Sequence, residues 1–380
     1  MRVLFIRDHL AWSGGTIYFL ETLPRLDSSR MQPILCVLHP RSPVAEEFEA
    51  QGIRPLFLER PKRDPRRFSD LVRLSRNMKA DLLHLSGPKS LLLGRLVARC
   101  TGIPAVAHLN NMLPEPRGMA LIQRRLASST AAALAVSHAV RQWAMRHYAL
   151  PPERVEVLYP GHDLDRFPLS GGDMRAQVRH ELQIPGEAAV IGLIGRVARE
   201  KGQLLMVQLM PELLKHRPSI VLLIVGDGPD LGDCQRRVAK LGLGAAVRFA
   251  GHRRDIPEVM AATDVVVVPS LCEEAFGLVA VEASAAGRPA VAFRSGGLSE
   301  VIIHNKTGLI VTKGDSAGLR NALEHVLSRP ELARRLGESG RRHAAQFTIE
   351  PHVQRLMAFH EAVLGQRKLR TSLATPACLL

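Results

Sequence analysis

Short apolar runs alternate along the chain with segments whose apolar positions recur every three to four residues. The runs have the length and character of strands buried on both faces, as in the four valines that follow Asp264. The segments between them have the period of helices that cover a sheet. This alternation indicates βαβ units and parallel sheets, and it predicts strands at residues 3–6, 34–38, 56–58, 82–85, 105–108, 132–136, 155–158, 190–195, 220–225, 247–249, 265–268, 290–293 and 308–311.

The length of the chain indicates two domains. At 380 residues it exceeds what one ordinary core accommodates, and the Gly-rich, polar segment 170–187 precedes the second set of strands. We interpret this segment as a linker that leads into a short helix. Helical patterns follow the last strand, and the segment after Gly365 is predicted to be unstructured. These patterns lie at 316–327, 331–346 and 352–364.

The composition is that of a globular protein, with 46% hydrophobic and 23% charged residues. The five cysteines show no Cys-x-x-Cys spacing, which favours neither a zinc site nor a disulfide framework and fits a reducing cytosol. Residues 2–7 hold too few apolar side chains for the core of a signal peptide. The least charged long run, 126–140, is too short and too polar to cross a bilayer. We therefore expect a cytoplasmic protein.

The formal net charge of +15 stands out and predicts a partner or surface of negative charge. Basic residues concentrate between Arg60 and Arg76, where seven of them outnumber Asp64 and Asp70. Because this segment continues as an amphipathic helical pattern, it is either a contact with an anionic membrane or a solvated positive face. Nucleic acid ranks last among the partners, since only 4% of the residues are aromatic and no nucleic-acid-binding motif occurs.

Two glutamates, Glu274 and Glu282, lie eight positions apart in the stretch 269–300. A helix that starts near Phe276 exposes unpaired main-chain amides beside Gly277, a position suited to an anion such as a diphosphate. Glu282, about a turn and a half into that helix, is then placed to reach a ribose diol, and Glu274 to meet sugar hydroxyls. A capped core helix with two solvated glutamates explains the spacing alone equally well.

Other candidate residues follow other strands, at the sheet edge where doubly wound folds bind ligands. A Gly-rich turn that includes Gly15 follows the first strand, and His108 ends the strand 105–108. Arg196 and Lys201, after the strand 190–195, are suited to neutralise a diphosphate leaving group without a metal. Taken alone, a plain turn, a structural histidine and two surface cations remain the alternatives.

The stretch 269–300 resembles the E-x7-E signature of the GT-B retaining glycosyltransferases of the GT4 type, also called group 1. Four further segments match that family's motifs in the same order, and the resemblance extends to about residue 365. These segments are Ser13-Gly14-Gly15; Gly195-Arg196 with Lys201-Gly202; Gly226-Asp227-Gly228-Pro229; and Gly296-Gly297 with Glu300 and Thr307-Gly308.

The resemblance implies a GT-B fold, in which two Rossmann-like, doubly wound α/β domains face each other across a cleft. We expect an acceptor-binding domain at residues 1–168, a nucleotide-sugar-binding domain at 169–349, a terminal helix at 350–365 that crosses back to the first domain, and a flexible tail at 366–380. Asp163 and Asp165 form an Asp-x-Asp pair in the inter-domain segment. We do not interpret this pair as a metal site, because the segment resembles a structural part of the family and two carboxylates alone hold a metal poorly. Pro160 stands where the family commonly has Asn.

The resemblance also implies roles for individual residues, and no metal or other cofactor is expected. The two cations would stabilise the departing diphosphate, Glu274 would hold sugar hydroxyls, and His108 would contact the donor sugar or the acceptor. A covalent role for Glu274 is the alternative. The residues expected to be catalytic are Arg196, Lys201, Glu274 and His108, and those expected to bind the donor are Gly15, Gly195, Gly226, Gly251, Phe276, Gly277, Leu278 and Glu282.

The implied activity is the retaining transfer of a sugar from a nucleotide-sugar donor to a saccharide or lipid-linked acceptor. Such a reaction serves the synthesis of cell-surface polysaccharide, lipopolysaccharide or glycolipid, at the inner face of the membrane if the basic segment 60–76 contacts lipid. The alternatives are a sugar-nucleotide epimerase of the same architecture and a non-catalytic nucleotide-sugar-binding subunit. A dehydrogenase is disfavoured, because Gly-x-Gly-x-x-Gly is missing after the first strand.

Overall fold

The computed structural model describes residues 1–61, 64–112, 116–167 and 172–374, and the chain forms two compact units. Unit 1 comprises Met1–His162 and Ile349–Leu380, and unit 2 comprises Asp163–Thr348. The chain therefore enters unit 2 after His162 and returns to unit 1 after Thr348. The sequence had placed these two boundaries after residues 168 and 349.

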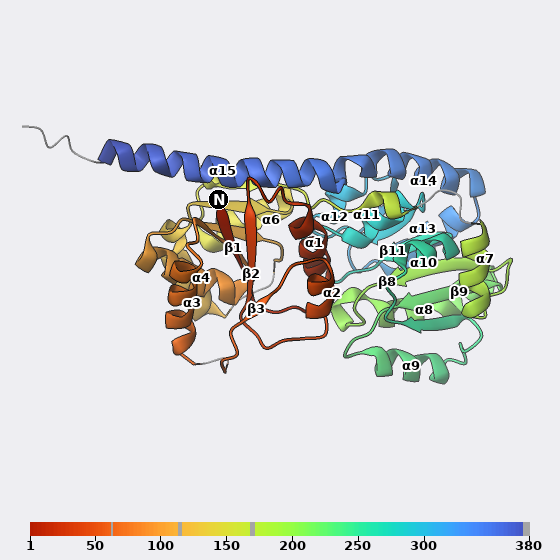
Figure 1. Ribbon diagram of the computed structural model, residues 1–380. Coiled ribbons are helices and arrows are strands. Elements are labelled where there is room, and N and C mark those ends of the chain that lie inside the picture. The colour runs from red at the N-terminus through yellow and green to blue at the C-terminus, as the bar shows by residue number, and fades with distance from the viewer. Residues whose placement is uncertain (62–63, 113–115, 168–171, 375–380) are drawn as a thin grey trace, which may run out of the picture. The chain divides into compact units, whose positions relative to one another are not determined.

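Unit 1 contains, within the described residues, a parallel sheet of seven strands in the order β3-β2-β1-β4-β5-β6-β7. Figure 1 labels β1, β2 and β3 of this sheet. Because the order reverses at β1, the carboxyl ends of β1 and β4 flank a topological switch point, where such sheets bind ligands. The strands are β1 (Arg2–Arg7), β2 (Gln32–Val37), β3 (Leu56–Phe57), β4 (Leu82–Ser86), β5 (Ala105–Leu109), β6 (Ala132–Ala135) and β7 (Val155–Val157). The helices that precede unit 2 are α1 (Gly14–Thr22), α2 (Ala45–Ala50), α3 (Arg66–Asn77), α4 (Pro88–Thr101), α5 (Arg117–Arg125) and α6 (His138–Tyr148).

The long C-terminal helix α15 (Ile349–Ala374) completes the core of unit 1. Its buried side chains Val353, Leu356 and Met357 pack in the same hydrophobic cluster as Phe5 of β1. Figure 1 shows this helix in blue, beside α1. The helix thus buries its apolar face on the sheet that the first 162 residues build.

The prediction of an unstructured tail from residue 366 is wrong for 366–374, which continue α15. Residues 375–380 of that predicted tail lie outside the described residues. Gly365 alone does not end the helix, because a single glycine costs only about 1 kcal/mol and the residues after it (Gln-Arg-Lys-Leu-Arg) favour helix.

Unit 2 contains, in the part that the structure describes, six parallel strands in the order β10-β9-β8-β11-β12-β13. Its switch point lies between β8 and β11. The strands are β8 (Ala189–Ile194), β9 (Ile220–Val225), β10 (Val247–Gly251), β11 (Val265–Val268), β12 (Ala290–Phe293) and β13 (Gly308–Val311). The helices are α7 (Gly172–Glu181), α8 (Gln203–His216), α9 (Leu231–Lys240), α10 (Ile256–Ala262), α11 (Leu278–Ala285), α12 (Leu298–Val301), α13 (Ser316–Leu327) and α14 (Pro330–Ala344).

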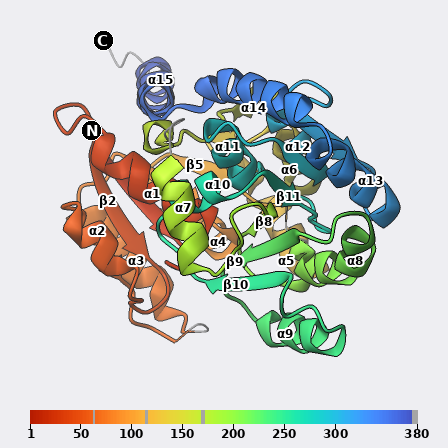
Figure 2. The same cartoon turned by 90° about the vertical axis from the view of Figure 1, so that its right-hand side faces the viewer.

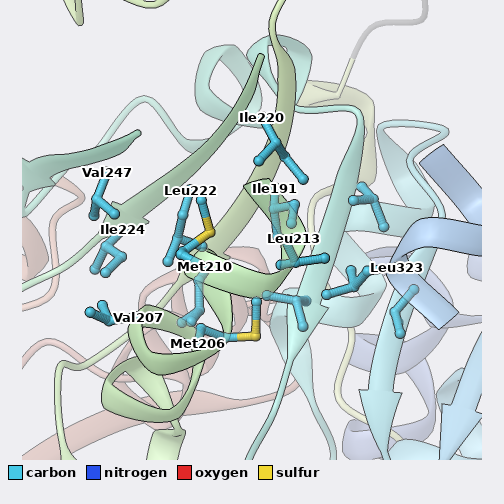
Figure 3. Close-up of a cluster of buried hydrophobic side chains, with 14 of the residues drawn as sticks. Ile191, Met206, Val207, Met210, Leu213, Ile220, Leu222, Ile224, Val247 and Leu323 are labelled. Atoms are coloured by element: carbon cyan, nitrogen blue, oxygen red, sulfur yellow. The ribbon is translucent and has the colours of Figure 1, made fainter. Parts of the chain in front are cut away.

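Helices cover both faces of the unit 2 sheet, as Figure 2 shows for α8 and α10. Ile191 and Leu222 point to one face, where they pack against Met206 and the rest of the buried side of α8 (Figure 3). Their neighbours along the strands, such as Val190, point to the other face and pack with Val259 of α10. Burial on both faces is the reason that these strands are continuous apolar runs rather than alternating ones.

The two Rossmann-like α/β units confirm the fold class predicted from the sequence. Each predicted strand is present, with ends that differ by a few residues at most. The predicted linker at 170–187 is mostly the helix α7, and residues 168–171 lie outside the described residues. Among the helices that the structure describes, none is both long enough and apolar enough to cross a membrane.

Candidate functional site

The loops that follow β8 and β11 meet at the switch point of unit 2. The main-chain oxygen of Glu200, in the 3-10 turn after β8, accepts a hydrogen bond from Leu271 N at 2.8 Å. Gly202 ends that turn with a φ of +81°, and a Cβ there would lie 2.3 Å from the oxygen of Pro269. Only glycine fits so close an approach. The contact brings the side chains of the two loops together.

Lys201 and Glu274 form an ion pair at this point, as Nζ lies 2.5 Å from Oε1. Ser270 Oγ donates to the same carboxylate oxygen, also at 2.5 Å. Glu274 Oε2 makes no hydrogen bond within the described residues. Because both protein donors converge on Oε1, the second oxygen is left to meet a ligand hydroxyl. Ser270 was not among the predicted residues, although its place four positions before Glu274 is visible in the sequence.

A second loop, after β12, holds the backbone that carries Glu274. Ser295 Oγ donates to Cys272 O at 2.5 Å and accepts from Glu274 N at 3.0 Å. Gly297 N donates to Glu274 O at 2.8 Å. Three hydrogen bonds therefore fix the main chain on both sides of the glutamate. The sequence predicted a loop at Ser295-Gly296-Gly297 but gave the side chain of Ser295 no role.

The N-terminus of α11 lies directly after this loop. Its N-cap is Gly277, with a φ of +103°, and a Cβ there would lie 2.3 Å from Leu298 Cδ2. The main-chain amides of Leu278 and Val279 have no hydrogen-bond partner in the described part of the chain, as expected for a first turn. Two unpaired amides at the positive end of a helix attract an anion.

Two predicted donor-binding residues on or beside α11 have buried side chains. Phe276 packs edge to face on Phe347, with ring centroids 5.3 Å apart, and is 6% exposed. Its side chain is therefore part of the core, and any contact with a donor would come from its main chain. Glu282, on the second turn, is 5% exposed. Its carboxylate is thus largely withdrawn from solvent.

Glycines with positive φ end three neighbouring strands of unit 2. They are Gly195, Gly226 and Gly251, with φ of +138°, +135° and +62° after or at the end of β8, β9 and β10. A Cβ on Gly226 would lie 2.0 Å from Gly195 O, so this pair of loops tolerates no side chain there. The edge beside the Lys201 loop is consequently lined by bare backbone, which a planar base can approach closely.

Arg196 does not join the Lys201–Glu274 pair. Its guanidinium instead forms an ion pair with Glu200, one helical turn away, and the arginine side chain is 55% exposed. At that exposure the pair contributes little to stability, and the long side chain is able to change partners. Arg196 therefore lies on the same loop as Lys201, but its guanidinium points to Glu200 and does not contact the Lys201–Glu274 pair.

Two predicted residues, Gly15 and His108, lie in unit 1, and the other ten lie in unit 2. The turn of Gly15 begins α1, and Arg7 of β1 donates to Gly15 O at 2.6 Å. The Arg7 guanidinium lies over the ring of Phe19, 4.6 Å from its centroid, and burial lowers the pKa of this arginine to about 10. The turn is thus held by a buried cation at the carboxyl end of β1.

His108, near the end of β5, is 6% exposed. Its Nδ1 lies 3.1 Å from Nε2 of His84, and His108 is one of the residues that line a narrow pocket. Burial lowers the pKa of His108 to about 3, which keeps the imidazole neutral at ordinary pH. The other residues that line this pocket are Gly87, Pro88, Leu91, Leu109, Asn110, Asn111, Trp143 and Tyr148.

The basic segment 60–76, which the sequence predicted to be a positively charged surface, is only partly exposed. Arg67 is 3% exposed and donates to the main-chain oxygen of Leu38, so its inclusion in a surface patch is wrong. Arg60 pairs with Asp70 at 2.7 Å, and Arg66 pairs with Asp64 at 2.8 Å. The exposed cations that remain on α3 are, among the described residues, Arg73 and Arg76, because Lys62 and Arg63 lie outside the described part of the chain. In those parts of the chain that are described, no three His, Cys, Asp or Glu side chains are grouped so as to hold a metal ion.

Two family models match the chain. The model for "Glycosyl transferases group 1" matches residues 174–343, and the model for "Glycosyltransferase Family 4" matches residues 12–166. The chain is also similar to the D-inositol 3-phosphate glycosyltransferase of Corynebacterium kroppenstedtii, with 30% identity over 257 residues, which are 65% of this chain and 57% of that protein. The chain spans about half to two thirds of the length of the curated relatives it matches.

Solved structures show the same fold. The structure of Anabaena Alr3699/HepE in complex with UDP and glucose has a TM-score of 0.87 at 22% identity, with 95% of this chain and 100% of that chain covered. That of WaaG, a glycosyltransferase involved in lipopolysaccharide biosynthesis, has a TM-score of 0.71 at 16% identity, with 94% and 99% covered. At these identities the likeness concerns the fold alone.

Proposed function

The chain belongs to the GT-B glycosyltransferases of group 1, and from this premise we propose that it transfers a sugar from a nucleotide-sugar donor to a hydroxyl group of a saccharide or lipid-linked acceptor. The observation that carries the proposal is the convergence of Lys201, Glu274 and Ser270 beside the N-terminus of α11. A cation, a carboxylate with a free oxygen and unpaired amides at one switch point suit a sugar diphosphate better than any other common metabolite class.

Each group of the unit 2 site has a part in binding the donor. Lys201 and the amides of Leu278 and Val279 bind the diphosphate, and Arg196 swings from Glu200 to join them. Glu274 accepts hydrogen bonds from sugar hydroxyls through Oε2, and Glu282 from the ribose. The glycines Gly195, Gly226 and Gly251 leave room for the base along bare backbone. Uridine is our first choice of base, because the Anabaena structure of the same fold is a complex with UDP.

The chemical step breaks the bond between the anomeric carbon and the β-phosphate oxygen, and that oxygen keeps the electron pair. The cations and helix amides stabilise the charge that develops there, which is the largest single contribution expected in such a site. The acceptor oxygen forms its bond to the anomeric carbon on the same face, and its proton passes to the departing phosphate. The anomeric configuration is thereby retained, and no step requires a metal.

The acceptor binds mainly to unit 1, near His108 and the turn of Gly15. Our proposal is a saccharide or lipid-linked acceptor of a cell-surface polysaccharide, lipopolysaccharide or glycolipid. An anionic acceptor is supported by the relative that is named for inositol 3-phosphate, and WaaG, a protein of the same fold, is involved in lipopolysaccharide biosynthesis. The net charge of +15 points the same way. We place the reaction in the cytoplasm, with α3 as a contact with the inner face of the membrane.

Calorimetric titration with UDP, GDP and ADP, and then with their sugar conjugates, tests the donor site directly. Incubation of the best conjugate with and without acceptor extracts then separates the candidate activities. A transferase releases nucleoside diphosphate in proportion to a new glycoside, whereas an epimerase releases a free sugar without any acceptor. Binding without turnover would identify a non-catalytic subunit, and no affinity for any of the nucleotides would refute the proposal.

A further inference from the structure

Three histidines form a hydrogen-bonded chain through the core of unit 1. His84 of β4 lies at its centre, with Nδ1 3.0 Å from Nε2 of His360 on α15 and Nε2 3.1 Å from Nδ1 of His108 on β5. His84 and His360 are both fully buried. The ring of Phe5 packs on His84 with centroids 4.7 Å apart. The chain therefore connects the buried face of α15 to the one member, His108, that lines a pocket.

All three rings are neutral at ordinary pH. Burial among apolar side chains disfavours the charged form, and it lowers the pKa of His108 and His360 to about 3 and that of His84 well below its usual value. The neighbouring cation Arg7 acts in the same direction on His84 and His108. Three neutral imidazoles carry three ring N–H groups in total.

The number of protons leaves two arrangements. Each of the two N···N hydrogen bonds contains one proton, and the neutral His84 can supply only one of them. The third proton must then lie at one end of the chain. It is either on Nδ1 of His360, with all three rings in the Nδ1–H form, or on Nε2 of His108, with all three rings in the Nε2–H form.

The two ends differ in their surroundings. Nδ1 of His360 is buried and has no hydrogen-bond partner in the described part of the chain. A proton there would be an orphaned buried N–H, the rarest kind of unsatisfied group in proteins. Nε2 of His108 also has no partner within the described residues, but it is not fully buried as Nδ1 of His360 is, and His108 is one of the residues that line the pocket. A proton at this end can bond to water or to a ligand.

We propose that His84 and His360 are positioning residues that hold His108 in its Nε2–H form, so that His108 presents a hydrogen-bond donor to the bound substrate. The identity of that substrate rests on the proposed function. A fixed donor suits a sugar hydroxyl oxygen or a phosphate oxygen. It also means that His108 does not take the proton of the acceptor hydroxyl, which agrees with transfer of that proton to the departing phosphate.

A fourth histidine supplies an internal reference. Nδ1 of His352 lies 2.8 Å from Tyr159 O, which can only accept, so the neutral His352 carries its proton on Nδ1. Its Nε2 then accepts from the hydroxyl of Tyr18, 3.0 Å away. The predicted pattern is three Nε2–H rings beside one Nδ1–H ring, and the opposite arrangement gives four Nδ1–H rings.

Correlation of ring nitrogens with ring carbon-bound protons, in protein labelled with 15N-histidine at pH 7.5, distinguishes the two tautomers. Single His→Gln variants at the four positions assign the signals. The proposal requires the Nε2–H pattern for His84, His108 and His360 in the wild-type protein. An Nδ1–H pattern for His108 would overturn it. The tautomers are read in the wild-type protein, so the variants serve only to assign signals and no substrate needs to be known.

A matched pair of variants at position 360 tests the positioning role. His360→Gln keeps an N–H that can donate to His84, whereas His360→Leu removes it. We expect His108 to stay in the Nε2–H form in the first variant and to populate Nδ1–H in the second, with kcat/KM lower in the second by roughly tenfold, the cost of one hydrogen bond to substrate. Equal kinetics and equal tautomers in both variants would show that the three hydrogen-bonded histidines contribute only packing and do not position His108. UDP affinity measured on the same samples tests the proposed function separately. A protein that fails to bind UDP would contradict the proposed function but would leave the tautomer result unchanged.

Discussion

The side-chain amine of Lys201 and the carboxylate of Glu274 lie 2.5 Å apart, although 73 positions separate the two residues in the sequence. They meet because β8 and β11 are neighbours at the switch point, so their loops leave the same edge of the sheet. The two side chains are 31% and 14% exposed, and an ion pair of that exposure adds at most about 1 kcal/mol to stability. Placement of the two groups, rather than stability, is therefore what the pair contributes.

Lys201→Ala and Glu274→Ala should each lower kcat/KM at least tenfold with little change in Tm. The loss of one charged hydrogen-bond partner costs roughly 1.5–3 kcal/mol in the transition state, or about 10- to 150-fold. Arg196→Ala should show a loss of the same size if its guanidinium joins the diphosphate. Initial rates and thermal unfolding of the purified variants measure both quantities.

Lys215→Ala is the control for this set, because Lys215 pairs with Glu212 at 2.7 Å on the exposed surface of α8. It removes a lysine and an ion pair of the same kind without touching the switch point. Wild-type kinetics in any of the three site variants would remove that residue from the mechanism.

Gly277→Ala should weaken nucleotide binding as well as stability. Alanine at a φ of +103° is strained, and its Cβ would lie 2.3 Å from Cδ2 of the fully buried Leu298, so we expect the N-terminus of α11 to shift. Gly314→Ala is the matched control, since Gly314 has a φ of +83° with open space around a Cβ. Both variants should lose about 1–2 kcal/mol of unfolding free energy, but only the first should lose affinity in calorimetry. Equal UDP affinities would show that the helix N-terminus does not bind the diphosphate.

The positions of the strands along the chain were visible in the sequence, because strands covered on both faces must be apolar throughout. The runs of Val265–Val268 and Ile220–Val225 leave little else to predict. Glu274 and Lys201 were also found, because their motifs resemble those of the group 1 glycosyltransferases, whereas the residue pattern alone left solvated glutamates and surface cations as alternatives. The sequence did not predict that the helix continues past Gly365, because the glycine was given more weight than the five helix-favouring residues that follow it.

Contacts between segments distant in the sequence were out of reach. Ser295 holds Glu274 only because β12 lies next to β11, and the strand order is not written in either loop. His84 and His360 are 276 positions apart, and each alone resembles an ordinary core histidine. Arg67 looked like its basic neighbours on α3, and only the fold shows that its side chain reaches the backbone of Leu38.

Unit 1 should lose stability steeply as the pH falls below about 6.5, the ordinary pKa of histidine. Burial lowers the pKa of His352 to about 4 and that of His360 to about 3 in the native state. The unfolded chain therefore binds protons that the native state does not, from about pH 6.5 downward to these values. Stability is fully present above pH 6.5 and declines below it, by about 1.4 kcal/mol per pH unit for each such histidine.

Denaturant unfolding followed by tryptophan fluorescence measures this decline, because both tryptophans, Trp12 and Trp143, lie in unit 1. His360→Leu should flatten the dependence by about 1.4 kcal/mol per pH unit between pH 6 and 5. His138→Gln, which replaces an exposed histidine of the same unit, should leave the slope unchanged. A wild-type stability that is constant from pH 7 to pH 5 would contradict the neutral, buried state of these rings.

If α3 contacts an anionic membrane, its remaining exposed cations must carry the attraction. Arg60 and Arg66 are neutralised by Asp70 and Asp64, and Arg67 is buried, so Arg73 and Arg76 are the residues to change. Each basic residue near an anionic surface contributes about 1 kcal/mol. The double variant Arg73→Gln with Arg76→Gln should therefore bind vesicles of phosphatidylglycerol and phosphatidylcholine roughly 30-fold more weakly in sedimentation assays, and raised salt should abolish the difference.

A double variant with the same charge change elsewhere separates a local contact from an effect of net charge. Arg236→Gln with Arg334→Gln removes two cations of unit 2 whose side chains are 75% and 63% exposed. Because salt screens the attraction between charges beyond about 8–10 Å at physiological ionic strength, cations outside the contact should contribute little to vesicle affinity. Equal weakening by the two double variants would therefore mean that no particular surface binds the membrane. If the wild-type protein does not sediment with anionic vesicles, the positive face of α3 is an ordinary solvated surface.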